Sequence, residues 1–231
     1  MLARTRLPAG DGEAKPHPTP MLKGAESNTG ACRLTLVRHG ETVGQSSIRY
    51  YGATDVELSE SGRRQMERVR AALAAEEFDA VYTSELQRTV VAARIVAPGR
   101  PVQPVAGFNE INFGRWEGLT REEIAARDPE LFRQWRLAPH EFTYPEGDHA
   151  LAFRERVAAT LRAWLPALPA RALLIVHKGV IGAVVTELLC LPVAERAAWP
   201  IDLGSIHTLV RNRGEWHCER MNRTDHLDGL Q

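Results

Sequence analysis

Two short apolar segments, each running into a histidine with a glycine close behind, constrain the fold of this chain more than any other feature. Residues 34–37 lead into Arg38-His-Gly40, and residues 172–176 lead into His177-Lys-Gly179. Short apolar runs of this kind predict buried strands. Ligands of open α/β sheets bind just outside the carboxyl ends of the strands. The repeated design therefore predicts one site at one edge of a sheet, built from both histidines.

Helical and strand-like patterns alternate along the rest of the chain. The segment after Leu58 has apolar residues at three- and four-residue steps, with Ser59 as the expected N-cap. Ser84 is the expected N-cap of the next helix. We expect further helices over residues 150–165 and 180–191 and further strands over residues 80–82, 102–105, 205–211 and 215–220. This alternation implies an α/β fold, a three-layer sandwich around a mostly parallel sheet.

The length of 231 residues fits one domain. Residues 1–30 are rich in glycine, proline, alanine and charge and lack periodicity, which predicts a disordered tail. We expect the protein to start at either Met1 or Met21. We expect a single domain over residues 31–222 and a C-terminal tail over residues 223–231. Periodicity weakens over about residues 107–149, as in a cap-like insertion that lies over the strand ends and carries binding loops.

Composition limits the partners that this chain can have. Its 29 basic and 29 acidic side chains give a formal net charge of zero, so no global field attracts nucleic acid or a membrane, and any anion site must be local. Neither a membrane-spanning run nor the apolar core of a signal peptide is present. Three scattered cysteines favour a reducing cytoplasm, and no cluster has metal-ligand spacing. We expect a cytoplasmic monomer or homodimer with no metal and no cofactor.

The residues around the first histidine suit an anion. Gly40 permits close approach of the backbone, and Arg38 supplies a forked pair of donors. A neutral imidazole nitrogen of His39 can attack phosphorus and hold the phosphoryl group covalently. Arg88 follows Ser84 in the first turn of an expected helix, whose N-terminus attracts phosphate. A structural histidine and an exposed helix arginine are the alternatives at these positions.

These motifs resemble those of a known family. Arg38-His-Gly-Glu-Thr42 after an apolar strand is similar to the signature of the histidine phosphatase superfamily, whose fold is phosphoglycerate-mutase-like. Ser84-Glu-Leu-Gln-Arg88 resembles the motif of the family's second phosphate-clamping arginine. Residues 108–118 resemble the stretch that holds its catalytic glutamate. The resemblance covers roughly residues 32–220.

The resemblance implies a role for each of five residues. His39 would take the phosphoryl group, and Arg38 and Arg88 would bind it. His177 would hydrogen-bond a phosphoryl oxygen and stabilise the charge that develops in transfer. Glu110 would protonate the leaving oxygen and later take a proton from the attacking water.

Two positions depart from the family pattern. Gln45 stands where the family commonly has an asparagine that contacts the phosphate, and its longer amide either makes that contact or leaves it missing. Lys178 stands where the family often has glycine, and it either contacts phosphate or substrate or points into solvent. Glu117 lies close to Glu110 in sequence, but the motif places the acid at Glu110.

Three functions compete on this basis. The leading one is a metal-independent phosphatase that hydrolyses a small phosphorylated metabolite through a phosphohistidine on His39. The alternative is a 2,3-bisphosphoglycerate-dependent phosphoglycerate mutase, although such mutases carry an Arg-His-Tyr-Gly run where this chain has Ile111-Asn-Phe-Gly114. The second alternative is a non-catalytic member that binds a phosphorylated ligand, which the presence of all five core residues disfavours.

The sequence leaves the identity of the substrate open. Specificity is expected within residues 111–149, whose aromatic and basic side chains either face the substrate or form local core and surface. These residues are Trp116, Trp135, Phe142 and Tyr144, together with Arg133, Arg136, His140 and His149. Ser205 and His207 could also border the pocket, and for His207 we favour a structural role.

Overall fold

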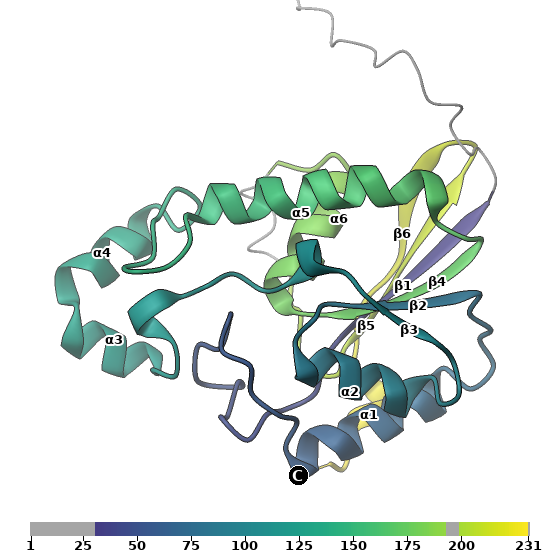
Figure 1. The fold of residues 1–231 in the computed structure, drawn as a ribbon, viewed down its shortest axis with the longest axis horizontal. Coiled ribbons are helices and arrows are strands. Elements are labelled where there is room, and N and C mark those ends of the chain that lie inside the picture. Colours follow the sequence, from purple (N-terminus) through teal and green to yellow (C-terminus); the bar gives the residue numbers. More distant parts are fainter. Residues whose placement is uncertain (1–30, 193–198, 231) are drawn as a thin grey trace, which may run out of the picture.

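The computed structural model describes residues 31–192 and 199–230, and it places helices on both faces of a six-stranded sheet (Figure 1). This is the expected three-layer α/β architecture. The predicted tail over residues 1–30 lies outside the described residues. Within the described part of the chain, no helix combines the length and the apolarity that crossing a membrane requires.

The parallel part of the sheet contains four strands, in the order β3-β2-β4-β1. The central pair is β1 (Cys32–Arg38) and β4 (Arg171–Val176), which are parallel neighbours. β2 (Ala80–Thr83) pairs in parallel with the other edge of β4, and β3 (Val102–Pro104) pairs in parallel with β2. The prediction of a mostly parallel sheet is therefore confirmed.

The antiparallel part is a C-terminal hairpin. β5 (Ile206–Asn212) pairs with the free edge of β1, and β6 (Glu215–Arg223) pairs with β5. β6 runs past its predicted end at Arg220, and the short 3-10 helix η5 (Asp225–Leu227) follows it. Regular structure thus extends into the stretch that we predicted as a C-terminal tail.

Two pairs of helices sandwich the sheet (Figure 1). α1 (Glu60–Ala72) and α2 (Gln87–Val96) cover one face. α5 (Ala150–Trp164) and α6 (Lys178–Leu188) cover the other face, and the 3-10 helix η3 (Leu165–Ala167) follows α5. α1, α2 and α5 each bury one stripe against the strands, as expected for surface layers of an α/β fold, whereas α6 is buried over most of its circumference.

β4 shows why residues 172–176 form a continuous apolar run. Leu173 and Ile175 lie in the core under α1 and α2, whereas Leu174 and Val176 lie in the core under α5 and α6. All four are fully buried. A central parallel strand is covered on both faces, so every position favours an apolar side chain.

The expected N-cap of α1 is present. The Ser59 hydroxyl accepts a hydrogen bond from Gly62 N at 3.0 Å. The apolar steps that predicted this helix correspond to Met66, Val69 and Leu73, which are buried. Local sequence signals were sufficient here because the cap and the buried face both belong to the same few turns.

The stretch between β3 and α5 contains only short elements. They are the 3-10 helices η1 (Ala106–Phe108) and η2 (Gly114–Trp116) and the α-helices α3 (Arg121–Arg127) and α4 (Pro129–Leu137). Figure 1 shows α3 and α4 far from the C-terminal hairpin, on the side toward which β1 runs.

Candidate active site

The register of the two central strands brings the two histidines together. Arg38 is the register partner of Val176, so His39 and His177 leave the sheet side by side. The backbone N–H of His39 donates to Val176 O at 3.0 Å. The two imidazole centroids lie 5.2 Å apart, with an interplanar angle of 67°. The prediction that both histidines share one sheet edge is therefore met by the geometry.

A hydrogen bond orients His39. Its Nδ1 lies 2.7 Å from Gly40 O, and because a carbonyl oxygen only accepts, Nδ1 carries the hydrogen. In the neutral ring, Nε2 then holds the lone pair. Burial, followed by the charges of Arg88 and Arg38, holds the pKa of His39 well below its ordinary value. The ring is therefore neutral at physiological pH, with Nε2 as its nucleophilic nitrogen.

His177 is held through both ring nitrogens. Arg88 Nε donates to Nδ1 at 3.3 Å, so Nε2 carries the hydrogen and donates to Ser84 Oγ at 2.8 Å. Burial, then the nearby positive charges, lowers the pKa of His177 well below its ordinary value. The two rings thus occupy opposite tautomers.

Ser84 does not cap α2, so that prediction was wrong. The helix begins at Gln87 after Leu86, without a side-chain cap. Ser84 Oγ instead contacts His177 and Thr89, and it accepts from the backbone of Leu86 at 3.2 Å. A tertiary contact has displaced the local capping role that the sequence pattern suggested.

Arg88 is fully buried and uses all three guanidinium nitrogens. Besides the bond from Nε to His177, Nη1 donates to Thr54 O at 2.8 Å and Nη2 donates to Gly52 O at 2.6 Å. Burial lowers the pKa of Arg88, while the nearby carboxylates of Glu110 and Asp55 raise it. The turn at residues 52–54 therefore fixes the guanidinium beside His177.

Arg38 approaches the site from the end of β1. Its Nη1 donates to Ile201 O at 2.8 Å. Its Nε is buried, and among the described residues it has no hydrogen-bond partner. Burial lowers the pKa of Arg38 to about 10, which leaves it cationic at neutral pH. This second fixed cation leaves a buried donor available for an anion.

Glu110 is nearly buried, and backbone groups orient its carboxylate. Oε2 accepts from Gly179 N at 2.8 Å, and Oε1 accepts from Ile111 N at 3.0 Å. A Cβ on Gly179 would lie 2.2 Å from Oε1, so a glycine is needed for this approach. Against the effect of burial, Glu110 raises the pKa of both Arg38 and Arg88, which places its charge beside the two cations.

The two departures from the family pattern lie at the surface. Gln45 is exposed at a turn with φ 63°, where its carbonyl accepts from Ile48 N and Arg49 N. Lys178 is exposed as the first residue of α6. α6 thus starts two residues before its predicted beginning at Val180. A phosphate contact from Gln45 or Lys178 stays a prediction.

The aromatic residues of the insertion mainly form a local core. Trp116, Phe142 and Tyr144 are buried, and Trp116 stacks on Phe142 with centroids 5.2 Å apart. Trp135 Nε1 donates to Tyr144 Oη at 3.2 Å. These contacts indicate that the three buried rings form a local core and not a wall that faces the substrate.

Basic residues of the insertion also have local partners. Arg133 forms an ion pair with Glu130 at 2.8 Å, and His149 Nδ1 caps α5 by accepting from Leu151 N at 3.0 Å. His207 is fully buried in β5, with Nε2 2.9 Å from Ser205 Oγ and Nδ1 accepting from Asn222 N at 3.1 Å. The geometry agrees with a structural role for His207.

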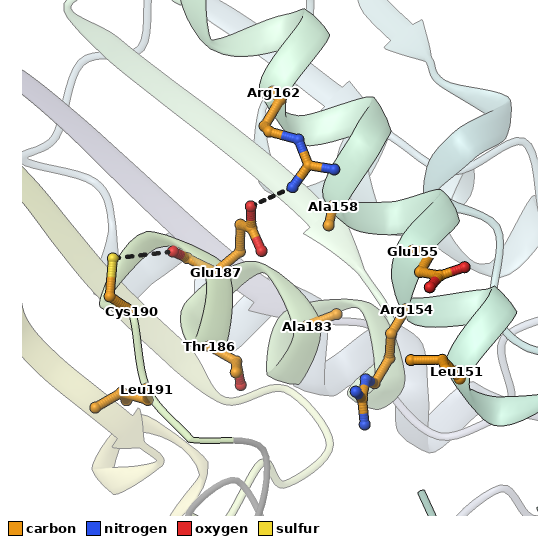
Figure 2. Close-up of a pocket in the computed structure, with 10 residues that line it drawn as sticks. All are labelled: Leu151, Arg154, Glu155, Ala158, Arg162, Ala183, Thr186, Glu187, Cys190 and Leu191. Carbon is orange, nitrogen blue, oxygen red and sulfur yellow. Dashed lines mark hydrogen bonds and ion pairs between the residues drawn. The ribbon is translucent and has the colours of Figure 1, made fainter. Parts of the chain in front are cut away.

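A hollow of about 380 Å³ lies between α5 and α6 (Figure 2). The ion pair between Arg162 and Glu187 bridges the two helices there. None of the predicted site residues lines this hollow. It is therefore separate from the histidine pair.

The converging groups suit a phosphate monoester. Two buried cations, Arg38 and Arg88, compensate an anion, and the lone pair of His39 can attack phosphorus. Glu110 can exchange a proton with a leaving or attacking oxygen. Sequence reasoning missed the contact of Ser84 with His177.

Comparisons with known proteins point the same way. Residues 34–224 match the histidine phosphatase superfamily (branch 1). An adenosylcobalamin/alpha-ribazole phosphatase of Salmonella typhimurium is 31% identical over 175 residues, covering 74% of this chain and 87% of that protein. Phosphoserine phosphatase 1 of Hydrogenobacter thermophilus is 33% identical over 131 residues, which are 56% of this chain and 62% of that protein, less than two thirds of its length. The solved structure of a mycobacterial glucosyl-3-phosphoglycerate phosphatase has a TM-score of 0.73 and 25% identity, covering 84% of this chain and 100% of that one.

Proposed function

The chain belongs to the histidine phosphatase superfamily, and from this premise we propose that it is a phosphoric monoester hydrolase that acts through a phosphohistidine on His39. The observation that carries the proposal is the orientation of His39. Its Nδ1 is held by Gly40 O, which leaves the lone pair of Nε2 for attack. Similarity to named phosphatases supports the same class of reaction.

The reaction consists of two displacements at phosphorus. The negative phosphoryl oxygens of the bound substrate favour the protonated form of Glu110 beside them, so Glu110 takes up a proton when the substrate binds. In the first displacement, His39 Nε2 forms a bond to phosphorus while the ester oxygen leaves and takes this proton from Glu110. In the second, water attacks the phosphohistidine and gives a proton to Glu110, and the bond to Nε2 breaks. Inorganic phosphate leaves, and neutral His39 and protonated Glu110 are restored. Arg38 and Arg88 balance the charge on the phosphoryl oxygens in both steps.

The proposed substrate is a small phosphorylated metabolite. The names of the relatives refer to phosphoserine, alpha-ribazole phosphate and glucosyl-3-phosphoglycerate chemistry, which all involve small molecules. We also propose a cytoplasmic location, because Cys32, Cys190 and Cys218 are unpaired and their number is odd. The single-domain organisation over residues 31–222 remains our proposal for the catalytic unit.

Phosphate release with chelator present tests the proposal. Wild type and His39→Ala are compared on a panel of small phosphate esters and on 3-phosphoglycerate primed with bisphosphoglycerate. We expect the wild type to hydrolyse at least one ester without added metal and the variant to release none. Interconversion of phosphoglycerates with little release would instead identify a mutase. Phosphate binding without either reaction would identify a non-catalytic member.

A further inference from the structure

The carboxylate of Glu117 accepts hydrogen bonds from three consecutive backbone N–H groups. They belong to Gly52, Ala53 and Thr54, at 2.9, 3.0 and 3.3 Å. Residues 52–54 lie in neither a helix nor a strand that could satisfy these donors. Hydrogen bonds to an ionised acceptor are among the stronger ones in proteins. Glu117 therefore fixes the shape of this turn.

The carbonyl groups of the same turn hold Arg88. Gly52 O accepts from Nη2 and Thr54 O accepts from Nη1. The N–H and C=O of a trans peptide point in opposite directions. The peptide that joins Gly52 to Ala53 consequently lies between the carboxylate on its N–H side and the guanidinium on its C=O side. Hydrogen bonds in series polarise and strengthen one another.

Two further contacts make this arrangement specific. A Cβ on Gly52 would lie 1.7 Å from Ile111 O and 2.8 Å from Glu117 Oε1, so the turn closes only around a glycine. Glu117 Oε1 also accepts from Phe113 N at 2.9 Å. One carboxylate thereby joins the turn that holds Arg88 to the stretch that carries Glu110.

We infer that Glu117 is a positioning residue that orients the Arg88 guanidinium for the phosphoryl group through the turn at residues 52–54. The inference rests on the proposed phosphate-binding role of Arg88. The hydrogen bonds of Glu117 come from backbone N–H groups, so it acts on the phosphoryl group through the turn and not directly. One peptide unit separates its carboxylate from the guanidinium. The negative charge of Glu117 also raises the pKa of Arg88, although burial lowers that pKa by more.

Titration calorimetry with inorganic phosphate on the full chain tests the inference without turnover. Glu117→Gln keeps the size of the side chain, but its amide has only one acceptor oxygen and no charge. We expect phosphate affinity to fall on the order of tenfold, the equivalent of one lost charge-assisted hydrogen bond. In an Arg88→Met background, Glu117→Gln should cause no further loss, because the group that it positions is gone.

Glu123→Gln is the matched control. Glu123 pairs with Arg49 at 2.7 Å, near the start of the same loop, and within the described part of the chain none of its hydrogen bonds reaches residues 52–54. We expect its phosphate affinity to equal that of wild type. Glu117→Asp, which keeps the charge on a shorter side chain, should give a smaller loss, and it replaces Glu117→Gln if that variant does not fold.

The outcomes separate this inference from the proposed function. An unchanged affinity in Glu117→Gln, or equal losses with and without Arg88, would overturn the inference even where the wild type hydrolyses esters. A different outcome is that Glu117→Gln lowers phosphate affinity only when Arg88 is present, while the wild type hydrolyses no ester. This outcome would overturn the proposed reaction and support the positioning role.

Discussion

The imidazole rings of His39 and His177 lie edge to face, 5.2 Å apart, and they carry their hydrogens on opposite nitrogens. His39 donates from Nδ1 to Gly40 O, whereas His177 donates from Nε2 to Ser84 Oγ. Each ring thus keeps one unprotonated nitrogen. For His39 this is Nε2, whose lone pair can attack phosphorus. For His177 it is Nδ1, which accepts from Arg88 Nε at 3.3 Å. Nδ1 must gain a proton, and Arg88 Nε must turn toward the anion, before His177 can donate to a phosphoryl oxygen there.

Anion binding should therefore be coupled to proton uptake by His177. Burial and positive neighbours lower the pKa of His177 in the free protein, so the ring is neutral near pH 7. A bound dianion favours the protonated ring, so affinity should rise as pH falls from 8 to 6. Sulfate is the suitable probe because it does not itself titrate in this range. Calorimetry in buffers of different ionisation enthalpy measures the uptake, for which we expect up to one proton.

Two variants identify the group that takes up this proton. His177→Asn should remove most of the coupling, whereas Glu110→Gln should leave it if His177 is the site. Sulfate affinity that is independent of pH in the wild type would contradict the prediction.

The acid limb of the rate profile should report His39. Burial, then the charges of Arg88 and Arg38, holds the pKa of His39 well below its ordinary value of 6.5. The nucleophilic neutral ring is thus the major form down to a pH below 6.5. We expect kcat/KM to show no loss as pH falls through 6.5 and to decline only at lower pH. Rates measured over the range in which the protein stays folded test this, and a limb centred at or above 6.5 would contradict it.

Ser84→Ala should impair catalysis more than a serine substitution elsewhere. Without the hydroxyl, the buried Nε2–H of His177 loses its acceptor. An unsatisfied buried donor costs about 1–3 kcal/mol of stability, and nothing at Nε2 then selects the tautomer of His177. We expect kcat to fall about tenfold. Ser59→Ala is the matched control, because it removes the cap of α1 and should cost about 1 kcal/mol of stability without changing kcat. Equal kcat values in the two variants would refute this role of Ser84.

The sequence was sufficient to predict that both histidines lie at one sheet edge, because this placement depends only on the order and direction of the strands. Apolar runs identify β1 and β4, and parallel strands present their carboxyl ends at one edge. It was not sufficient for Ser84, because the hydroxyl has two competing partners. The local one is the N-terminus of α2, and the other is His177, 93 positions away in the chain. Only the tertiary structure decides between them.

The start of α6 shows the same limit. The expected start was Val180, and Gly179 before it is a poor helix former. The structure includes it in the helix because its N–H binds Glu110 and its missing Cβ leaves room for that carboxylate. The sequence left the role of the aromatic residues open for a related reason. Trp116 and Phe142 suit a substrate wall and a core equally well, and their burial became visible only in the fold.

His207 should make the folded state sensitive to acid. Burial lowers the pKa of His207 to about 4, whereas the unfolded chain takes up the proton near 6.5. The unfolded state therefore binds more protons between these values, and the free energy of unfolding falls as pH decreases. For this one residue the loss between pH 7 and pH 5 is about 2 kcal/mol.

Urea unfolding of wild type and His207→Gln at both pH values isolates this contribution. Glutamine can replace the hydrogen bonds to Ser205 and Asn222 but does not titrate, so the variant should lose about 2 kcal/mol less than wild type on acidification. The variant is expected to be less stable than wild type at pH 7, because its amide fits these two partners less well, and that difference should shrink at pH 5. His39 and His177 are present in both proteins, so their acid sensitivity cancels in the comparison. Parallel losses in the two proteins would show that His207 takes up its proton equally in the folded and unfolded states.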